Sequence, residues 1–144
     1  MNVAIAFGRD AHTAGLLTYD DDGVSGNCFV NRLPDAPHLA VMVKQTGGHF
    51  LMDGKALGYD EPTLQLLVRG TKDPSTGAAL AQSLYDHYHG LHGVTLDPTG
   101  EAVRLIDCTC LQSGPVHIGT EESGRHLYSL NLALHVRNAT PNRE

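Results

Sequence analysis

The sequence predicts one α+β domain, in which two helices pack on one face of a mostly antiparallel or mixed sheet. Three features predict this fold. A strictly alternating strand pattern stands near the C-terminus, a helix with a clear capping signal stands in the middle, and a short amphipathic helix opens the chain. The length of 144 residues is typical of one domain. We therefore expect residues 1–144 to fold as a single unit.

The first predicted element is a short helix over residues 2–14. Val3, Ala6 and Phe7 share one face of it, at spacings of three and four residues. The acidic run that follows, Asp20-Asp21-Asp22 before Gly23, predicts a solvated turn.

Two strands and a long loop are predicted between the acidic turn and residue 62. Residues 27–32 predict a short strand, and residues 33–37 then interrupt regular structure because they contain two prolines. Residues 38–45 alternate with a period of two, as a strand does. Residues 46–62 hold four glycines and predict a long loop or arm, with a small hairpin turning at Asp53-Gly54 as an alternative.

The middle of the chain gives another strand and the strongest helix. Residues 62–69 alternate as a strand, and Asp73 is a good N-cap in front of Pro74, which suits the first helical position. The helix is expected to end at Gly90 or Gly93. Its apolar stripe recurs every four residues: Leu80, Leu84 and Tyr88.

The last part of the chain predicts two long strands. Residues 101–112 are apolar on both faces, which favours a central place in the sheet, and residues 126–137 form the clearest strand. Residues 138–144 are polar and are expected to fray. On the last strand, Tyr128, Leu130, Leu132, Leu134 and Val136 point one way, whereas Ser129, Asn131, Ala133, His135 and Arg137 point the other way.

Composition argues against several functional classes. The net charge is −6 and no basic run occurs, so tight binding of nucleic acid through its phosphates is not expected. The three cysteines and the absence of a signal peptide favour free thiols in a reducing compartment. The sequence contains no stretch of about 20 apolar residues, so no membrane span is predicted.

The sequence offers one weak candidate for a metal-dependent enzyme. Asp86, His87, His89 and His92 cluster near the end of the middle helix, where His89 and His92 could share a metal ion with Asp86. The spacing matches no established metal motif, and a polar helix end is the simpler interpretation. Cys108 and Cys110 lie two apart on a strand and are expected to be small buried hydrophobic residues.

No other pattern predicts catalysis. The serines before Gly114 and Gly124 lack the flanking glycines of a nucleophile turn, and the glycines of residues 46–62 do not form a phosphate loop. The run Asp20-Asp21-Asp22 lacks the alternate carboxylates of a calcium loop. We therefore expect neither enzymatic activity nor a cofactor.

Five segments provide a family resemblance through their order and spacing: 33–37, 62–70, 81–86, 91–93 and 112–132. Together they resemble the tail terminator (minor capsid) proteins of long-tailed bacteriophages, especially those of actinobacterial hosts. The resemblance covers residues 25–138 and extends into the strand at 125–137. Two departures are Gly114, which separates Ser113 from Pro115, and residues 1–24, which match only as a generic helix.

This resemblance implies an assembly protein of the virion. It implies a homo-oligomeric ring, usually a hexamer, which is assembled in the host cytoplasm, caps the tail tube and joins the tail to the head-completion or connector proteins at the head-tail junction. Genomic DNA would pass through the lumen without specific binding. Neither catalysis nor a cofactor is implied. Another head-completion or tail tube protein on a similar fold remains an alternative.

Three groups of residues become candidate sites on this interpretation. The polar face of the last strand is expected to meet water, a neighbouring subunit or the pore. The acidic loops suit a lumen that repels phosphate, and residues 46–62 suit an arm that reaches the tube or connector. The subunit-interface candidates are Arg125, Ser129, Asn131, His135 and Arg137; the acidic candidates are Asp20, Asp21, Asp22, Glu121 and Glu122; the loop candidates are Gly47, Phe50, Asp53 and Lys55.

Overall fold

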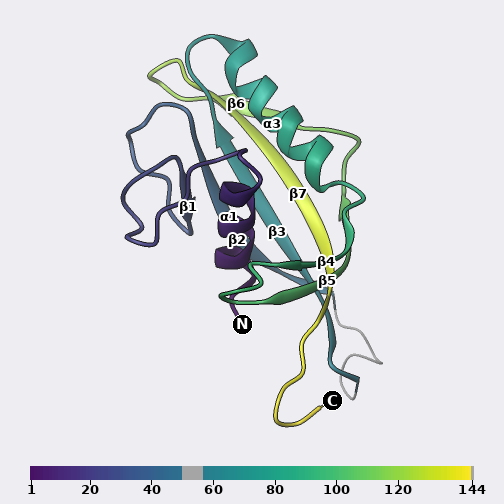
Figure 1. Ribbon diagram of the computed structural model, residues 1–144. Helices are drawn as coiled ribbons and strands as arrows, with labels where there is room; N and C mark the ends of the chain where they lie inside the picture. The colour runs from purple at the N-terminus through teal and green to yellow at the C-terminus, as the bar shows by residue number, and fades with distance from the viewer. Residues whose placement is uncertain (50–56, 144) are drawn as a thin grey trace.

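A computed structural model shows the arrangement of the chain and describes residues 1–49 and 57–143 (Figure 1). Two helices and seven strands follow one another along these residues. In order they are α1 (Val3–Thr13), β1 (Cys28–Val30), β2 (Ala40–His49), β3 (Tyr59–Arg69), α3 (Pro74–Tyr88), β4 (His92–Leu96), β5 (Val103–Cys110), β6 (Val116–Thr120) and β7 (His126–Arg137).

The strands form one mixed sheet in which β7 is the central spine. The strand order is β1-β2-β3-β7-β5-β4, and every pair is antiparallel except β1 with β2. One edge of β7 pairs with β3 along almost its whole length. Its other edge is shared, because β5 pairs with the second half of β7 and β6 pairs with the first half.

Both helices lie on the same face of this sheet and close the core (Figure 1). Helix α1 packs against β1 and β2, whereas α3 crosses β7 and β3. The helices also meet each other, since the rings of Phe7 and Tyr88 lie 4.1 Å apart and the Tyr88 hydroxyl donates to Asp10 Oδ2 at 2.8 Å. The α+β fold with two helices on one face is therefore confirmed.

The caps explain where the helices begin. Asn2 Oδ1 accepts a hydrogen bond from the Ile5 amide at the start of α1. Asp73 Oδ1 accepts from the Ser75 amide in front of Pro74, which is the first residue of α3 as the sequence predicts.

Two short strands were missed by the sequence analysis. Helix α3 ends at Tyr88, and strand β4 begins at His92, between the two glycines, Gly90 and Gly93, at which the helix was expected to end. Strand β6 contains Gly119 and has no buried residue. Neither has the alternating burial that identifies a strand from sequence, because both are held mainly by pairing with β5 or β7.

Strand β5 is shorter than expected and is not central. It covers Val103–Cys110, rather than residues 101–112, and lies second from the edge, between β7 and β4. Its apolar character on both faces comes partly from Ile106, an exposed residue at an irregularity in the pairing with β7.

The expected loop over residues 46–62 is strand at both of its ends. β2 continues to His49, and β3 begins at Tyr59. A bulge between Gln45 and Gly48 lets β2 continue, and only glycine fits at position 48, because a Cβ there would lie 2.1 Å from the carbonyl oxygen of Glu61. The hairpin considered at Asp53-Gly54 lies outside the described residues.

The residues after β7 turn back towards β3. The Asn138 amide donates to the Gly58 carbonyl, and Arg143 forms an ion pair with Asp60 at 2.6 Å. The guanidinium holds the pKa of Asp60 below its usual value, since the hydrogen bond favours the charged carboxylate.

No helix within residues 1–49 and 57–143 is long and apolar enough to cross a membrane.

Candidate functional site

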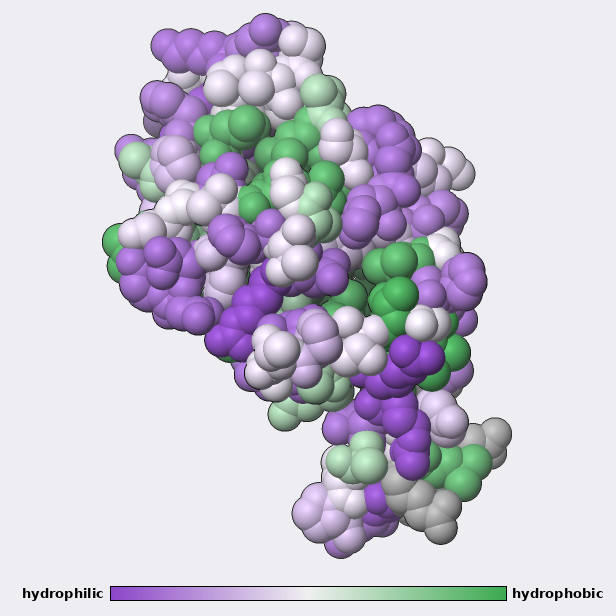
Figure 2. Space-filling model, in the orientation of Figure 1, coloured by the Kyte–Doolittle hydropathy of each residue, from purple (hydrophilic) through white to green (hydrophobic). Residues whose placement is uncertain are grey.

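The face of the sheet opposite the helices is the first candidate assembly surface. Along β7, Asn131, Ala133 and His135 point to this open face, between Gln65 of β3 and Thr109 of β5. A hollow of about 290 Å³ lies in it, lined by Glu61, Asp107, Thr109, Leu111, Ala133, Leu134 and His135. The opposite, helix-bearing side is seen in Figure 2, where hydrophilic residues surround separate hydrophobic areas.

The candidate interface residues of β7 differ in their surroundings. Ser129 is buried and accepts a hydrogen bond from Gln65 Nε2 at 3.1 Å. Asn131 is half-buried and donates weakly to the Gln112 side chain at 3.4 Å. His135 meets the Tyr59 ring edge-on, with centroids 5.6 Å apart. A partner could therefore reach Asn131 and His135 more readily than Ser129.

Arg137 is held at the C-terminal end of β7. Its guanidinium donates to the carbonyl oxygens of Leu57 and Gly58, and it lies 5.1 Å from the centre of the Tyr59 ring. Arg137 therefore joins the end of β7 to the start of β3.

Arg125 is itself buried, but its ion network reaches the surface, because the side chain of its partner Asp35 is 97% exposed. Arg125 is only 5% exposed, and it donates to the Asp35 carboxylate at 2.8 Å, to Glu121 Oε2 at 3.0 Å and to Ser123. A hydrogen bond from Arg125 lowers the pKa of Asp35. The network fastens the segment before β2 to the turn before β7.

A second buried arginine completes this network and was not singled out from the sequence. Arg69 is 3% exposed, and it donates to the carbonyl oxygens of Pro37 and His38. Glu121 lies 3.9 Å from Arg69 as well as beside Arg125. Glu121, a candidate for the lumen, thus serves as a counter-charge to two buried guanidinium groups.

The acidic turn at Asp20-Asp21-Asp22 is organised within the chain. Asp22 accepts hydrogen bonds from the amides of Val24 and Ser25, which lower its pKa. Asp20 accepts from the Asp22 amide, and Asp21 pairs with Arg9 at 3.0 Å while its side chain stays largely exposed. Glu122, in the other acidic loop, is exposed.

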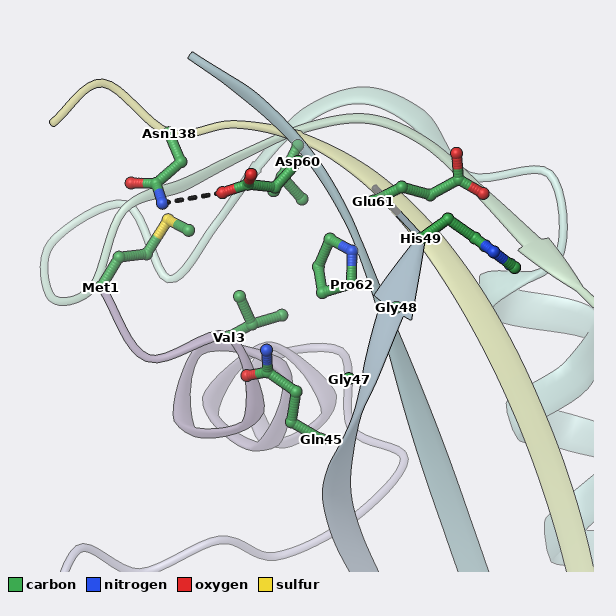
Figure 3. Close-up of a pocket in the computed structure, with 11 residues that line it drawn as sticks. Met1, Val3, Gln45, Gly47, Gly48, His49, Asp60, Glu61, Pro62 and Asn138 are labelled. Atoms are coloured by element: carbon green, nitrogen blue, oxygen red, sulfur yellow. Dashed lines mark hydrogen bonds between the residues drawn. The ribbon is translucent and has the colours of Figure 1, made fainter. Parts of the chain in front are cut away.

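A shallow pocket of about 360 Å³ lies where the far end of β2 meets the start of the chain (Figure 3). Gly47 and Gly48 form one wall, and Met1 and Val3 form another. The dashed bond in Figure 3 joins Asn138 Nδ2 to Asp60 Oδ2 at 3.0 Å. Of the loop candidates, Gly47 lies here, whereas Phe50, Asp53 and Lys55 lie outside the described residues.

The histidines considered for a metal site do not converge. His87 faces Asp10 at 4.0 Å, His89 Nδ1 accepts from the Cys110 amide, and His92 contacts the Gly90 carbonyl. Asp86 instead accepts a hydrogen bond from Gln82. In the part of the chain that the structure describes, no three His, Cys, Asp or Glu side chains are grouped so that they could hold a metal ion.

The three cysteines are buried, as the sequence predicts for Cys108 and Cys110. Burial raises the pKa of Cys28 to about 12, and burial together with the neighbouring Cys110 raises that of Cys108 to about 12. These thiols are therefore protonated at neutral pH and are poor nucleophiles or metal ligands.

Comparison with known proteins identifies the family. The family model described as bacteriophage tail terminator protein matches residues 12–138, which is most of the chain. The match extends from the end of α1 to the residue after β7, and so includes the whole sheet and α3. No curated protein and no solved structure matches the chain. This family comprises structural phage proteins rather than enzymes, and the chain belongs to the bacteriophage tail terminator proteins.

Proposed function

We propose that this tail terminator forms a closed ring, a hexamer, that caps the tail tube and stops its polymerisation. The family membership supports the role at the end of the tail. The observation that carries the ring is the one-sided sheet, because helices cover one face of it and leave the other face open for contact. A ring needs head-to-tail contacts between two different surfaces of the same subunit.

The proposed partners are those of a protein at the head-tail junction of the virion. The ring contacts the tail tube protein on one side and a head-completion or connector protein on the other, after assembly in the host cytoplasm. The loop candidates Gly47, Phe50, Asp53 and Lys55 are proposed to contact the tube or connector; the position of Gly47 two residues before the end of β2 supports this for the first of them.

Genomic DNA is proposed to pass through the ring without specific binding. The net charge of −6 supports this, because an acidic lumen repels the phosphates of the moving DNA. Among the acidic candidates, Asp20, Asp21 and Glu122 are the better lumen or ring-face residues, because all three are exposed. Asp21 also pairs with Arg9, but Asp22 accepts hydrogen bonds from two backbone amides, and Glu121 lies beside two buried arginines. The role is structural, with neither catalysis nor a cofactor.

The open face of β7 is proposed to lie against a neighbouring subunit. Asn131 and His135 are its accessible polar residues, and Ser129 and Arg137 flank them along the strand. Arg125 contributes indirectly, by holding the turn that leads into β7.

Native mass spectrometry and electron microscopy of the purified protein, with and without tail tubes, test this proposal. We expect a closed ring that binds to the tube end and arrests its growth. A chain that stays monomeric even when tubes are present, and leaves tube length unchanged, would contradict it.

The acidic candidates need a separate test in the virion. We expect the combined substitution of Asp20, Asp21 and Glu122 by their amides to alter DNA retention or assembly. Unchanged infectivity and tail morphology would refute the lumen assignment.

A further inference from the structure

The sheet has an open edge at β6, and this edge carries two exposed apolar side chains. Within residues 1–49 and 57–143, strand β6 pairs only with β7, and none of the residues of β6 is buried. Val116 and Ile118 are 40% and 50% exposed. Exposed edge strands of soluble proteins are normally protected by charged side chains or by a covering element, because free backbone groups invite another strand to pair.

A second open edge lies on the opposite border of the sheet. Strand β1 pairs with β2 only from Val41 to Val43. Among the described residues, no strand covers the outer edge of β2 over residues 44–49, and all six of these residues are exposed. These two edges are different surfaces of one subunit, as a head-to-tail contact requires. Among the described residues the outer edge of β4 is also unpaired, but β4 has no large exposed hydrophobic residue, whereas β6 has two.

We propose that β6 of one copy pairs with residues 44–49 of β2 in the next copy, and that this edge-to-edge contact joins the subunits of the ring. This inference rests on the proposed ring and names the surfaces that close it. Strand addition of this kind supplies backbone hydrogen bonds for affinity and side-chain contacts for specificity.

Strand direction fits the proposed contact. Strand β2 is antiparallel to β3, β3 is antiparallel to β7, and β7 is antiparallel to β6, so β2 and β6 run in opposite directions. Rotation about an axis roughly along the strands preserves these directions from copy to copy. The new pair is then antiparallel, like most pairs within the sheet.

The offset between the two edges also fits a closed ring. The residue pairs of the sheet set the middle of β6 level with the start of β2. The middle of residues 44–49 lies about five residues further along β2, which is about 17 Å along a strand. Each copy contributes four strands to the ring at this level, β2, β3, β7 and β6, so the repeat from one copy to the next is about 19 Å at ~4.8 Å per strand. These two lengths give a strand tilt of about 40°, within the range of roughly 35–45° found in closed sheets.

Charge complementarity favours a second copy as the occupant. An antiparallel pairing centred on the two edges brings Lys44, at the start of one segment, to the end of β6, where Glu121 and Glu122 follow. Lys44 and Glu122 are both exposed. Oppositely charged residues at the end of a strand pair help to fix its register.

The first test introduces a charged side chain on β6, to prevent another strand from pairing with it. Native mass spectrometry and light scattering on the full chain measure the result. We expect Ile118→Lys to abolish the ring at concentrations at which the wild type remains assembled. The matched control is Ala79→Lys, which places the same charge at an exposed position of helix α3, outside both strand edges and the acidic turn. Circular dichroism checks that both variants fold.

The second test exchanges the charges of Lys44 and Glu122. It gives a result even if Ile118→Lys fails to fold. We expect Lys44→Glu and Glu122→Lys each to weaken assembly by about tenfold, and the double variant to recover most of the loss, as a direct charge pair requires. If the wild type forms rings and these variants form them equally well, the edge contact is wrong while the proposed function stands. If the wild type forms no ring even with tail tubes, the proposed function itself fails.

Discussion

At the scale of single residues, the buried arginines dominate the electrostatics of the fold. Arg69 and Arg125 are withdrawn from water, and burial lowers the pKa of Arg69 because desolvation disfavours its charged form. Glu121 offsets both charges from the turn before β7. A buried charge that loses its partner is costly, since nothing replaces the lost hydration.

Replacing Glu121 should therefore destabilise the protein, whereas replacing its neighbour should not. We expect Glu121→Gln to lower the Tm by roughly 5 °C, because the buried Arg69 loses the carboxylate beside it and the buried Arg125 keeps only Asp35 of its two ion-pair partners. Glu122→Gln, at an exposed position, should change the Tm by no more than about 1 °C. Differential scanning calorimetry measures both. Equal effects would show that Glu121 is a surface charge without a role in the network.

The buried thiols give a second prediction at this scale. Because the pKa values of Cys28 and Cys108 are raised to about 12, both stay protonated in the folded state at pH 8. Exposure on unfolding restores a pKa of about 8.5, so stability contributed by these thiols is present below pH ~8.5 and is lost as the pH rises towards 12. With Ellman's reagent at pH 8, we expect slow labelling of the native protein and rapid labelling of all three cysteines in guanidinium chloride. Rapid labelling of the native protein would contradict the burial.

At the scale of elements, helix α3 approaches the sheet closely through two glycines. A Cβ added at Gly77 would lie 2.9 Å from the Cα of Gly70 and 3.0 Å from a ring carbon of Tyr128. The Tyr128 hydroxyl also donates to the Pro74 carbonyl at 2.8 Å, so the first turn of α3 is fixed against β7. The close approach depends on the absence of side chains at these two positions.

Gly77→Ala should consequently destabilise the protein, although alanine is the better helix former. We expect a loss of about 1–2 kcal/mol, because the cost of overpacking exceeds the gain of about 1 kcal/mol in helix propensity. Ala79→Gly, at an exposed position of the same helix, should lose about 1 kcal/mol through propensity alone. Urea unfolding measures both, and a stabilised Gly77→Ala would show that the helix can move away from β3.

Local signals explain which elements could be predicted from the sequence. Helix α3 and strand β7 carry a cap or a long alternation within their own residues, and they were predicted within a few residues of their ends. Strands β4 and β6 are short, contain glycine and depend on partners elsewhere in the chain. The ion network has no local signal, because Asp35 and Arg69 meet Arg125 only through the fold.

At the scale of the whole molecule, the two ends of the chain contribute unequally. The C-terminal residues attach through the pair of Arg143 with Asp60, whose side chain is 40% exposed. We expect deletion of residues 139–144 to lower the Tm by only about 2 °C at pH 7. Because the pKa of Asp60 is lowered in the folded state, this difference is present above pH ~4 and disappears as the pH falls further. Thermal melts at pH 7 and pH 3 measure it; a difference that persists at pH 3 would exclude the ion pair as its cause.

The N-terminal helix, in contrast, is needed to complete the core. The family match begins at residue 12, yet Phe7 of α1 is fully buried, and its ring packs at a tilt against Tyr88 of α3, which joins the two helices above the sheet. We expect Phe7→Ala to lower the free energy of unfolding by about 3–4 kcal/mol, because it leaves a cavity between the helices. Tyr88→Phe, which removes only the hydroxyl bonded to Asp10, should lose about 1 kcal/mol. Urea unfolding of both variants measures the difference. A loss below about 1 kcal/mol for Phe7→Ala would mean that the sheet and α3 form a stable core without α1, as the limits of the family match alone would suggest.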